Sequence, residues 1–273
     1  MAQTGHLTGT PVATEPWLSP VTWLRIAILL TILVVWEAVA ASGILLREVV
    51  PSVVTIGRSL VELLFHPELK VSLLGREFLI PAFYWHLYVT IAEVATALVI
   101  GGTTGLAVGL LLGANPFLSK AFERYLYYLG PTPKIVFFPV MIMWFGVGPE
   151  SKIAMGTLSC FFPIVLSAAS GMRQIEGVLI RVGRSFRLNT WQMVTKIYLP
   201  AMREPIVNGV RLGMGVAMIG TLLAETKLSN KGIGFTIIDA YNTFDMPRMY
   251  AVLGTLFVIA IGANALVSRA SRG

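Results

Sequence analysis

Hydrophobic positions along the chain fall into six long runs, and shorter polar stretches separate them. An apolar run of about 20 residues with few charges is long enough to cross a bilayer as a helix. The pattern therefore predicts an all-α polytopic membrane protein with six transmembrane helices, at residues 23–43, 86–113, 125–145, 153–172, 205–224 and 249–268. Residues 1–22, rich in Thr, Gly and Pro, are expected to be a disordered tail, and residues 269–273 a second short tail.

The first run has a second interpretation, because Ala38-Val39-Ala40 resembles a signal-peptidase site. A long leading region with almost no charge, and Glu37 beside the site, favour a retained transmembrane helix instead. Residues 44–84 follow as an extracytoplasmic segment. After Pro51-Ser52 its apolar positions recur at helical spacing but share the helix with charges, which predicts an interfacial helix: Val53, Ile56, Leu60, Leu63 and Leu64 with Arg58 and Glu62.

Between the fourth and fifth runs, residues 173–204 form a polar, basic stretch with a helical pattern of its own. Asn189 is placed to cap a helix, with Gln192 completing a capping box, and Leu199-Pro200 changes the chain direction. A basic segment that exposes Trp and Phe is typical of a surface that enters a partner's groove. The spacing predicts two short amphipathic helices, the first with Val178, Leu179, Val182 and Phe186 on one face and the second with Trp191, Val194 and Ile197.

Composition and charge agree with a membrane protein, since 55% of residues are hydrophobic, 13% are charged and the mean hydropathy is +0.75. A soluble domain of 273 residues could not bury this much apolar surface, so we expect a multi-pass protein of the cell (inner or plasma) membrane. With the leading tail in the cytoplasm, more basic residues lie inside than outside, including those of 173–204. The positive-inside rule then places both termini in the cytoplasm, and the net charge of +7 does not indicate nucleic-acid binding.

Glycine recurs at every fourth residue of the second run, at Gly101, Gly105, Gly109 and Gly113. Such a stripe lies on one face of a helix and lets another helix approach closely. Two interpretations stay open. The stripe serves helix packing alone, or it forms a packed seam that slides or rocks during transport.

Five residues inside the runs are candidates for a translocation path. Pro131, Pro133 and Lys134 interrupt the third run, and proline frees backbone carbonyls that hydrocarbon cannot satisfy. A broken helix there should face protein or a water-filled path, although a buried proline kink with a paired Lys134 is the alternative. Glu93 and Glu225 are candidates because acids inside a membrane are often functional. Both lie near the outer ends of their runs, where interfacial solvation explains them equally well.

The sequence carries no motif for catalysis. A phosphate-binding loop, a zinc-protease pattern and a nucleophile elbow are all absent. The histidines at 6, 66 and 86 make no convincing metal cluster, so we expect neither a metal nor another cofactor. If the protein performs work, a separate component supplies the energy.

Five stretches, at 130–153, 161–176, 184–201, 208–215 and 222–240, resemble the permease subunits of ATP-binding-cassette (ABC) importers of the nitrate/sulfonate/taurine type. Residues 176–200 resemble the cytoplasmic "EAA" loop of that family. The resemblance runs from Trp85 to about Leu266 and implies the type I ABC importer (MetI-like) fold, with a core of five transmembrane helices at 85–268 and a cytoplasmic coupling loop at 173–204. The stretches that carry it are GPTPKIVFFPVMIMWFGVGPESKI (130–153), FFPIVLSAASGMRQIE (161–176), RSFRLNTWQMVTKIYLPA (184–201), NGVRLGMG (208–215) and LLAETKLSNKGIGFTIIDA (222–240).

The resemblance also implies partners and a function. Two copies of the permease, as a homodimer, would work with two cytoplasmic ABC ATPase subunits and an extracytoplasmic solute-binding protein. The ATPases would move the coupling loop as a lever, and the solute would be a small anion or a small polar organic compound such as a sulfonate or nitrate. The loop residues expected to contact the ATPase are Val182, Phe186, Arg187, Asn189, Trp191, Val194, Leu199 and Pro200.

The coupling loop departs from the family pattern. When the loop is aligned on its Trp-Gln and Leu-Pro pairs, the family's acidic residue falls on Arg181 and its helix-breaking glycine on Arg187. Because Arg adopts a positive φ less readily than Gly, we expect a reshaped turn or a left-handed residue at Leu188 or Asn189 instead. Position 93, often basic in the family, is Glu93 here.

Two other functions remain as alternatives. A secondary carrier or channel that is not powered by an ATPase would need inverted repeats or a paired relay of charges within the membrane, and neither is clear. A membrane-integral enzyme is disfavoured by the missing nucleophile and metal patterns. An ATPase that co-purifies with the chain distinguishes the importer from both.

Overall fold

The computed structural model describes residues 20–43, 49–67, 69–73 and 76–270. Two units, Met1–Thr55 and Ile56–Gly273, make up the chain and are described separately. The predicted tail at 1–22 lies outside the described residues except for 20–22, which begin a helix. Of the predicted tail at 269–273, only the first two residues are described, and they end the last helix.

The first unit contains helix α1 (Pro20–Ser42) and the start of α2 (Val53–Phe65). The side chains of α1 are largely exposed, as suits a helix that meets lipid. Trp36 Nε1 donates a hydrogen bond to the carbonyl of Pro51 at 3.1 Å. Glu37 Oε2 accepts from the backbone N–H of Val53 at 2.9 Å, so a side chain of α1 satisfies the first free donor of α2.

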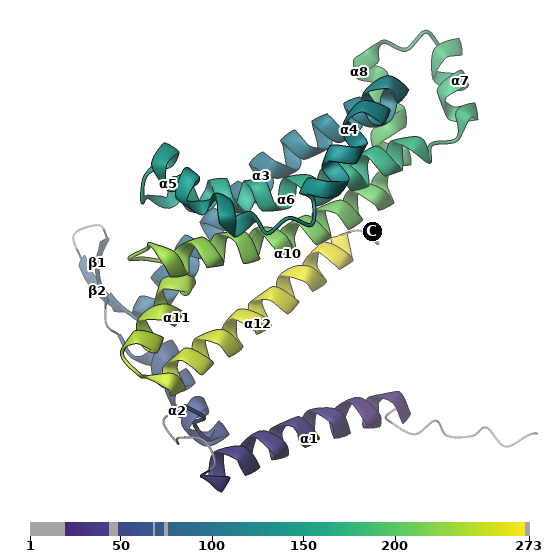
Figure 1. Ribbon diagram of the computed structural model, residues 1–273. Coiled ribbons are helices and arrows are strands. Elements are labelled where there is room, and N and C mark those ends of the chain that lie inside the picture. Colours follow the sequence, from purple (N-terminus) through teal and green to yellow (C-terminus); the bar gives the residue numbers. More distant parts are fainter. Residues whose placement is uncertain (1–19, 44–48, 68, 74–75, 271–273) are drawn as a thin grey trace, which may run out of the picture. The chain divides into compact units, whose positions relative to one another are not determined.

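Three long helices form the centre of the second unit: α3 (Ala82–Ala114), α6 (Pro149–Arg173) and α10 (Arg203–Lys227). Helix α6 packs against both of the others (Figure 1). Helices α3 and α6 run in the same direction and α10 runs opposite to them. The ends of α3 and α6 and the start of α10 therefore lie at one end of the core, next to residues 173–204.

The contact between α3 and α6 lies along the glycine stripe of α3. A Cβ atom added at any of the four glycines would lie 2.8–3.1 Å from a backbone carbonyl oxygen of α6, which is closer than carbon and oxygen normally approach. Each glycine therefore sits directly against the α6 backbone. The pairs are Gly101 with Thr157, Gly105 with Phe161, Gly109 with Val165 and Gly113 with Ala169.

At the far end of this core, shorter elements pack around the start of α3. Helices α2, α11 (Ile233–Asn242) and α12 (Met246–Ala270) bury a small apolar cluster of Leu63, Phe83, Ile233 and Val252. Strands β1 (Leu69–Leu73) and β2 (Arg76–Ile80) form an antiparallel hairpin with residue 69 opposite residue 80. Helix α2 is the helix that the sequence predicted after Pro51-Ser52. The β-hairpin and α11 were not predicted.

Among the described residues, five single helices are long and apolar enough to cross a membrane: α1, α3, α6, α10 and α12. The third predicted run is not one straight span over 125–145. It consists of α4 (Pro116–Leu129), followed by the 3-10 turn η1 (Lys134–Phe137) and α5 (Phe138–Phe145), and the two parts are bent by 93°. Helix α4 starts early because Asn115 Oδ1 caps it by accepting from the N–H groups of Phe117 and Leu118. With the bent pair counted as one span, the described residues contain six candidate membrane spans.

Candidate functional site

Residues 173–204 extend beyond the ends of α6 and α10 as a chain of short helices (Figure 1). The capping box is confirmed: Asn189 Oδ1 accepts from the N–H of Gln192 at 2.8 Å, and Gln192 Oε1 accepts from the N–H of Asn189 at 3.0 Å. This reciprocal cap fixes where the second amphipathic helix begins. The elements are α7 (Gly177–Ser185), α8 (Thr190–Met193), the π-helix η2 (Val194–Tyr198) and α9 (Leu199–Ala201).

The inner side of this 173–204 loop is held by Met193, a residue that the sequence analysis did not single out. Met193 is 8% exposed and faces Gly183 of α7. A Cβ at Gly183 would lie 2.5 Å from Ile197 Cδ1, so glycine lets α7 approach the second helix. Ile197, which was predicted on the apolar side of the second helix, therefore faces α7. The four-residue spacing of Met193 and Ile197, which places both on one helix face, was the sequence signal that could have predicted this contact with α7.

The outer side of the loop exposes large apolar side chains. Phe186 is 76% exposed and Trp191 is 73% exposed. Val182 and Pro200 are also exposed, whereas Val194 and Leu199 are half-buried. Exposed apolar side chains of this size are candidates for an interaction surface. The exposed basic residues around them are Arg181, Arg184, Arg187 and Lys196.

The turn after α7 keeps its left-handed residue at Arg187, with φ of 50°. The N–H of Leu188 donates to the carbonyl of Gly183 at 3.1 Å, and the N–H of Arg187 donates to that of Arg184 at 3.0 Å. These two bonds define a Schellman motif, in which the residue after the helix is normally Gly. The expectation that the turn is reshaped or moves to Leu188 or Asn189 is therefore wrong. The closing hydrogen bonds stabilise a backbone geometry that an Arg side chain disfavours.

Replacing Arg187 with Gly should stabilise the loop, because Gly adopts a positive φ without the steric cost of about 1 kcal/mol that a side chain adds. We expect amide hydrogen exchange in α7 to slow by roughly fivefold, the equivalent of about 1 kcal/mol. The matched control is Arg184→Gly, within the same helix, which should speed exchange because Gly weakens a helix interior by about 1 kcal/mol. Equal exchange in wild type and Arg187→Gly would show that the turn carries no strain.

The break between α4 and η1 borders a pocket of about 550 Å³ between the bent pair, α6 and α10. Pro131, Pro133 and Lys134 line it, and Lys134 is the one charged residue among its lining. Lys134 Nζ donates to the carbonyls of Leu129, at 3.1 Å, and Gly130, and lies 5.0 Å from the centre of the Phe162 ring. The lysine thus satisfies carbonyls that end α4, beside an otherwise apolar space.

Glu93 and Glu225 do not line this pocket. They lie together at the end of the core remote from the 173–204 loop, where Glu225 is fully buried and Glu93 is 5% exposed. Both are buried, and Glu93 also lines a pocket of about 330 Å³ at that end of the core. Lys152 is buried beside them because α6 begins at Pro149, four residues before the predicted span. The structure thus separates the five path candidates into two groups.

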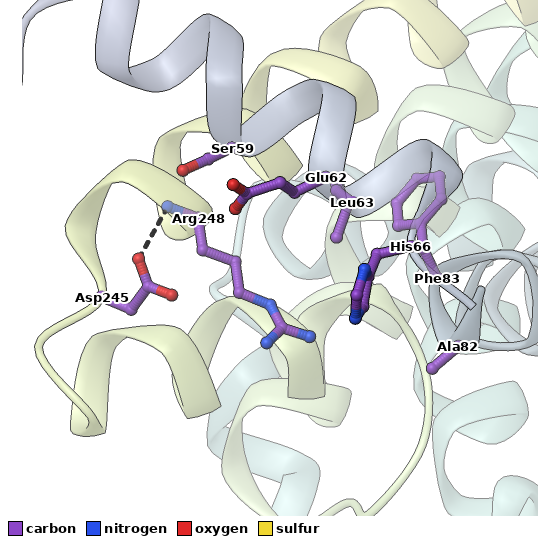
Figure 2. A pocket seen from close by; sticks show the side chains of 8 residues that line it. All are labelled: Ser59, Glu62, Leu63, His66, Ala82, Phe83, Asp245 and Arg248. Carbon is purple, nitrogen blue, oxygen red and sulfur yellow. Dashed lines mark hydrogen bonds between the residues drawn. The ribbon is translucent and has the colours of Figure 1, made fainter. Parts of the chain in front are cut away.

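A further hollow of about 240 Å³ lies near the same remote end, between α2, the start of α3 and the start of α12. Figure 2 shows the side chains of Glu62, His66 and Arg248 turned toward this hollow. Asp245 Oδ1 accepts from the backbone N–H of Arg248 at 3.1 Å and so caps α12. Nothing in the sequence pattern indicated this cluster, because its members come from distant segments. Within the described part of the chain, no group of three or more His, Cys, Asp or Glu side chains is placed to hold a metal ion.

Comparison with known families decides the class of protein. A family model described as "Binding-protein-dependent transport system inner membrane component" matches residues 101–271, more than half of the chain. The chain belongs to this family. It is the membrane permease component of an ABC importer, and the family implies an ATPase and a solute-binding protein as partners.

Relatives and a solved structure agree with this assignment. The permease is 27% identical over 241 residues to SsuC of Bacillus subtilis, covering 88% of this chain and 82% of SsuC. It is 27% identical over 207 residues to TauC of Escherichia coli, covering 74% and 75% of the two chains. Their names assign them to aliphatic sulfonate and taurine transport. A chain of the MetNI methionine ABC transporter matches with a TM-score of 0.60 at 20% identity, covering 68% of this chain and 92% of that one, which confirms the predicted MetI-like fold.

Proposed function

We propose that the permease passes a small anionic solute along the break between α4 and α5, and that the 173–204 loop couples this passage to an ATPase. The exposed Phe186 and Trp191 carry the proposal. Exposed apolar patches mark interaction sites, and Trp is enriched among the residues that carry most of the binding energy of an interface. The other loop residues that we propose for the contact with the ATPase are Val182, Arg187, Asn189, Val194, Leu199 and Pro200.

In this proposal, both termini and the 173–204 loop face the cytoplasm. The basic side chains of the loop support this orientation, because cytoplasmic loops are enriched in Lys and Arg. The remote end of the core, with α11 and the β-hairpin, then faces the solute-binding protein. A cysteine placed at Asn189 should stay unlabelled by an impermeant reagent in intact cells.

The pocket beside the break suits a small anion. Its single charge is the positive charge of Lys134, and its other lining residues are mostly apolar. Most of a binding pocket is apolar in general, and a few polar groups set the specificity. The names of SsuC and TauC, which refer to sulfonates and taurine, support an anionic head group.

A second permease copy completes the proposed path, and a separate subunit hydrolyses ATP. Large apolar side chains next to the break are exposed in the single chain, among them Val136, Met143 and Trp144. An exposed apolar surface beside a path suits a homodimer interface. Since the sequence contains no phosphate-binding loop, we assign no enzymatic activity to the permease itself.

The test is uptake by proteoliposomes that contain the permease, its ATPase and its solute-binding protein. Nitrate and bicarbonate serve as anionic probes, and taurine serves as a zwitterionic probe with an anionic sulfonate group. We expect uptake of at least one of the three, and we expect that uptake to require ATP. Lys134→Met should lower that uptake by roughly tenfold or more, because a charged hydrogen bond is worth about 1.5–3 kcal/mol, whereas Lys134→Arg should keep most of it.

Folding must be controlled in this test, because Lys134 also holds the carbonyls at the end of α4. Uptake is therefore compared only between variants that have the melting temperature and the ATPase content of the wild type. Uptake without ATP would support a secondary carrier in place of the importer. Unchanged uptake by a folded Lys134→Met variant would remove Lys134 from the path.

A further inference from the structure

A pocket of about 330 Å³ lies at the end of the core remote from the 173–204 loop, between the first turns of α3, the start of α6 and residues 229–231. Trp85 and Tyr88 of α3 line it, and their rings are stacked with centroids 5.8 Å apart. Glu93, further along the same helix, also lines the pocket and is 5% exposed. Small-molecule sites span about 300–1,000 Å³, so a pocket of this volume suits a small solute.

The carboxyl group of Glu93 is incompletely hydrogen-bonded. Its Oε2 atom is buried and receives no donor from the described residues. Glu225, the other buried glutamate at this end, differs: the Thr90 hydroxyl donates to its Oε1 at 2.7 Å, and the N–H of Gly234 donates to its Oε2 at 2.6 Å. Glu225 is thus satisfied within the fold, and it does not line the pocket. A buried acceptor without a donor is costly, which makes Glu93 Oε2 the atom where a ligand can donate a hydrogen bond.

Two lysines also line the pocket, and among the described residues neither forms an ion pair with Glu93 within 4 Å. Lys152 is buried, and its Nζ donates to two backbone carbonyls that precede α6. Lys231 is exposed, with its Nζ 6.0 Å from the centre of the Trp85 ring. The pocket therefore combines a buried carboxyl group that lacks a donor with an exposed ammonium group and an aromatic wall.

We propose that this pocket binds a small zwitterion, a compound with an ammonium group and a sulfonate or carboxylate group. The ammonium group donates to Glu93 Oε2, in a pocket where both a carboxylate and aromatic faces attract a cation. The anionic group pairs with the exposed Lys231. A simple anion fits less well, because it supplies no donor and Glu93 repels it. The site is separate from the pocket at Lys134. Only its role as the first site on the path rests on the proposed function.

The test measures ligand binding to the purified complex of permease and ATPase in lipid nanodiscs by ligand-observed NMR. Taurine and free glycine serve as zwitterions, and ethanesulfonate and acetate serve as their counterparts without an amino group. We expect the wild type to bind at least one zwitterion roughly tenfold or more tightly than its counterpart, because the ammonium group adds a charged hydrogen bond. No ATP is added, so a failure of ATP-driven uptake would not affect this measurement.

Three variants locate the ligand. Glu93→Gln keeps the size of the side chain but removes its charge, so it should weaken binding of the zwitterion by roughly tenfold or more and spare its counterpart. Lys231→Met should weaken binding of both by up to roughly fivefold, since solvent screens an exposed charge. The matched control is Glu150→Gln, an exposed glutamate at the start of α6 that does not line the pocket, and it should bind as the wild type does.

The proposal is overturned if neither zwitterion binds more tightly than its counterpart, or if a folded Glu93→Gln variant keeps the wild-type affinity. If Glu93→Gln does not fold, wild-type affinity in Lys231→Met overturns it instead. Equal weakening by Glu93→Gln and Glu150→Gln would mean a general effect of charge and no site. Loss of binding in Lys134→Met alone would place the ligand at the break, which contradicts this site while supporting the proposed path.

Discussion

Trp191→Asp is expected to abolish co-purification of the ATPase with the permease and, with it, ATP-dependent uptake. Trp191 is 73% exposed, so the change does not disturb the buried contact between Gly183 and Met193. Truncating an aromatic anchor at an interface typically costs about 2 kcal/mol or more, which weakens binding by roughly 30-fold. Aspartate adds the desolvation of an unpaired charge, so its effect should exceed that of Trp191→Ala.

The matched control places the same charge on the preceding residue. Thr190 is exposed at the start of α8, where an acidic residue suits the helix N-terminus, so Thr190→Asp should keep the ATPase. Membrane insertion should be unchanged in both variants, because neither position lies in a membrane-spanning helix. If Trp191→Asp binds the ATPase as well as Thr190→Asp does, the exposed apolar side of the loop is not the docking surface.

Gly109→Leu should destabilise the folded permease by about 3 kcal/mol or more, which corresponds to a drop of roughly 10 °C in melting temperature. A Cβ at this position would lie 2.8 Å from the carbonyl oxygen of Val165 and 2.5 Å from Ala168 Cβ. One neighbour is a backbone oxygen of α6 and the other is a Cβ atom of α6, and neither can rotate away. Even Gly109→Ala should lower the melting temperature, because one methyl group already requires α3 and α6 to separate.

The control for this experiment is Gly262→Leu on α12, where an added Cβ would find no atom within 4 Å. It makes the same chemical change in a membrane-spanning helix without a close neighbour. We expect its melting temperature to stay near that of the wild type. Equal melting temperatures for Gly109→Leu and Gly262→Leu would mean that the stripe is not a packed seam.

Features that depend on local spacing could be predicted from the sequence. The position of α2, the capping box at Asn189 and the break at Pro131 and Pro133 each follow from a few neighbouring residues. The family resemblance supplied the fold, because five ordered stretches are far more specific than any single motif. The start of α4 was missed since Asn115-Pro116, which caps it, lies before the apolar run.

What depends on distant contacts could not be predicted. The burial of Glu93 and Glu225 follows from the packing of α3 against α10, and no local pattern shows that packing. The burial of Lys152, which directly precedes the predicted span at 153–172, depends on where α6 begins and could not be predicted either. The turn at Arg187 was misjudged for another reason. Residue propensity alone disfavours Arg there, and the two closing hydrogen bonds outweigh it.

The seam between α3 and α6 has a consequence for movement. Glycines at four-residue intervals face carbonyls at the same intervals, so the two surfaces match again after a shift of four residues, about 6 Å along the helix axis. At intermediate shifts the glycines would no longer lie opposite the carbonyls, and bulkier residues between them, such as Val108, would approach the carbonyl row. A helix pair of this kind has discrete registers separated by poorly packed positions. We infer that any displacement along this seam proceeds in steps.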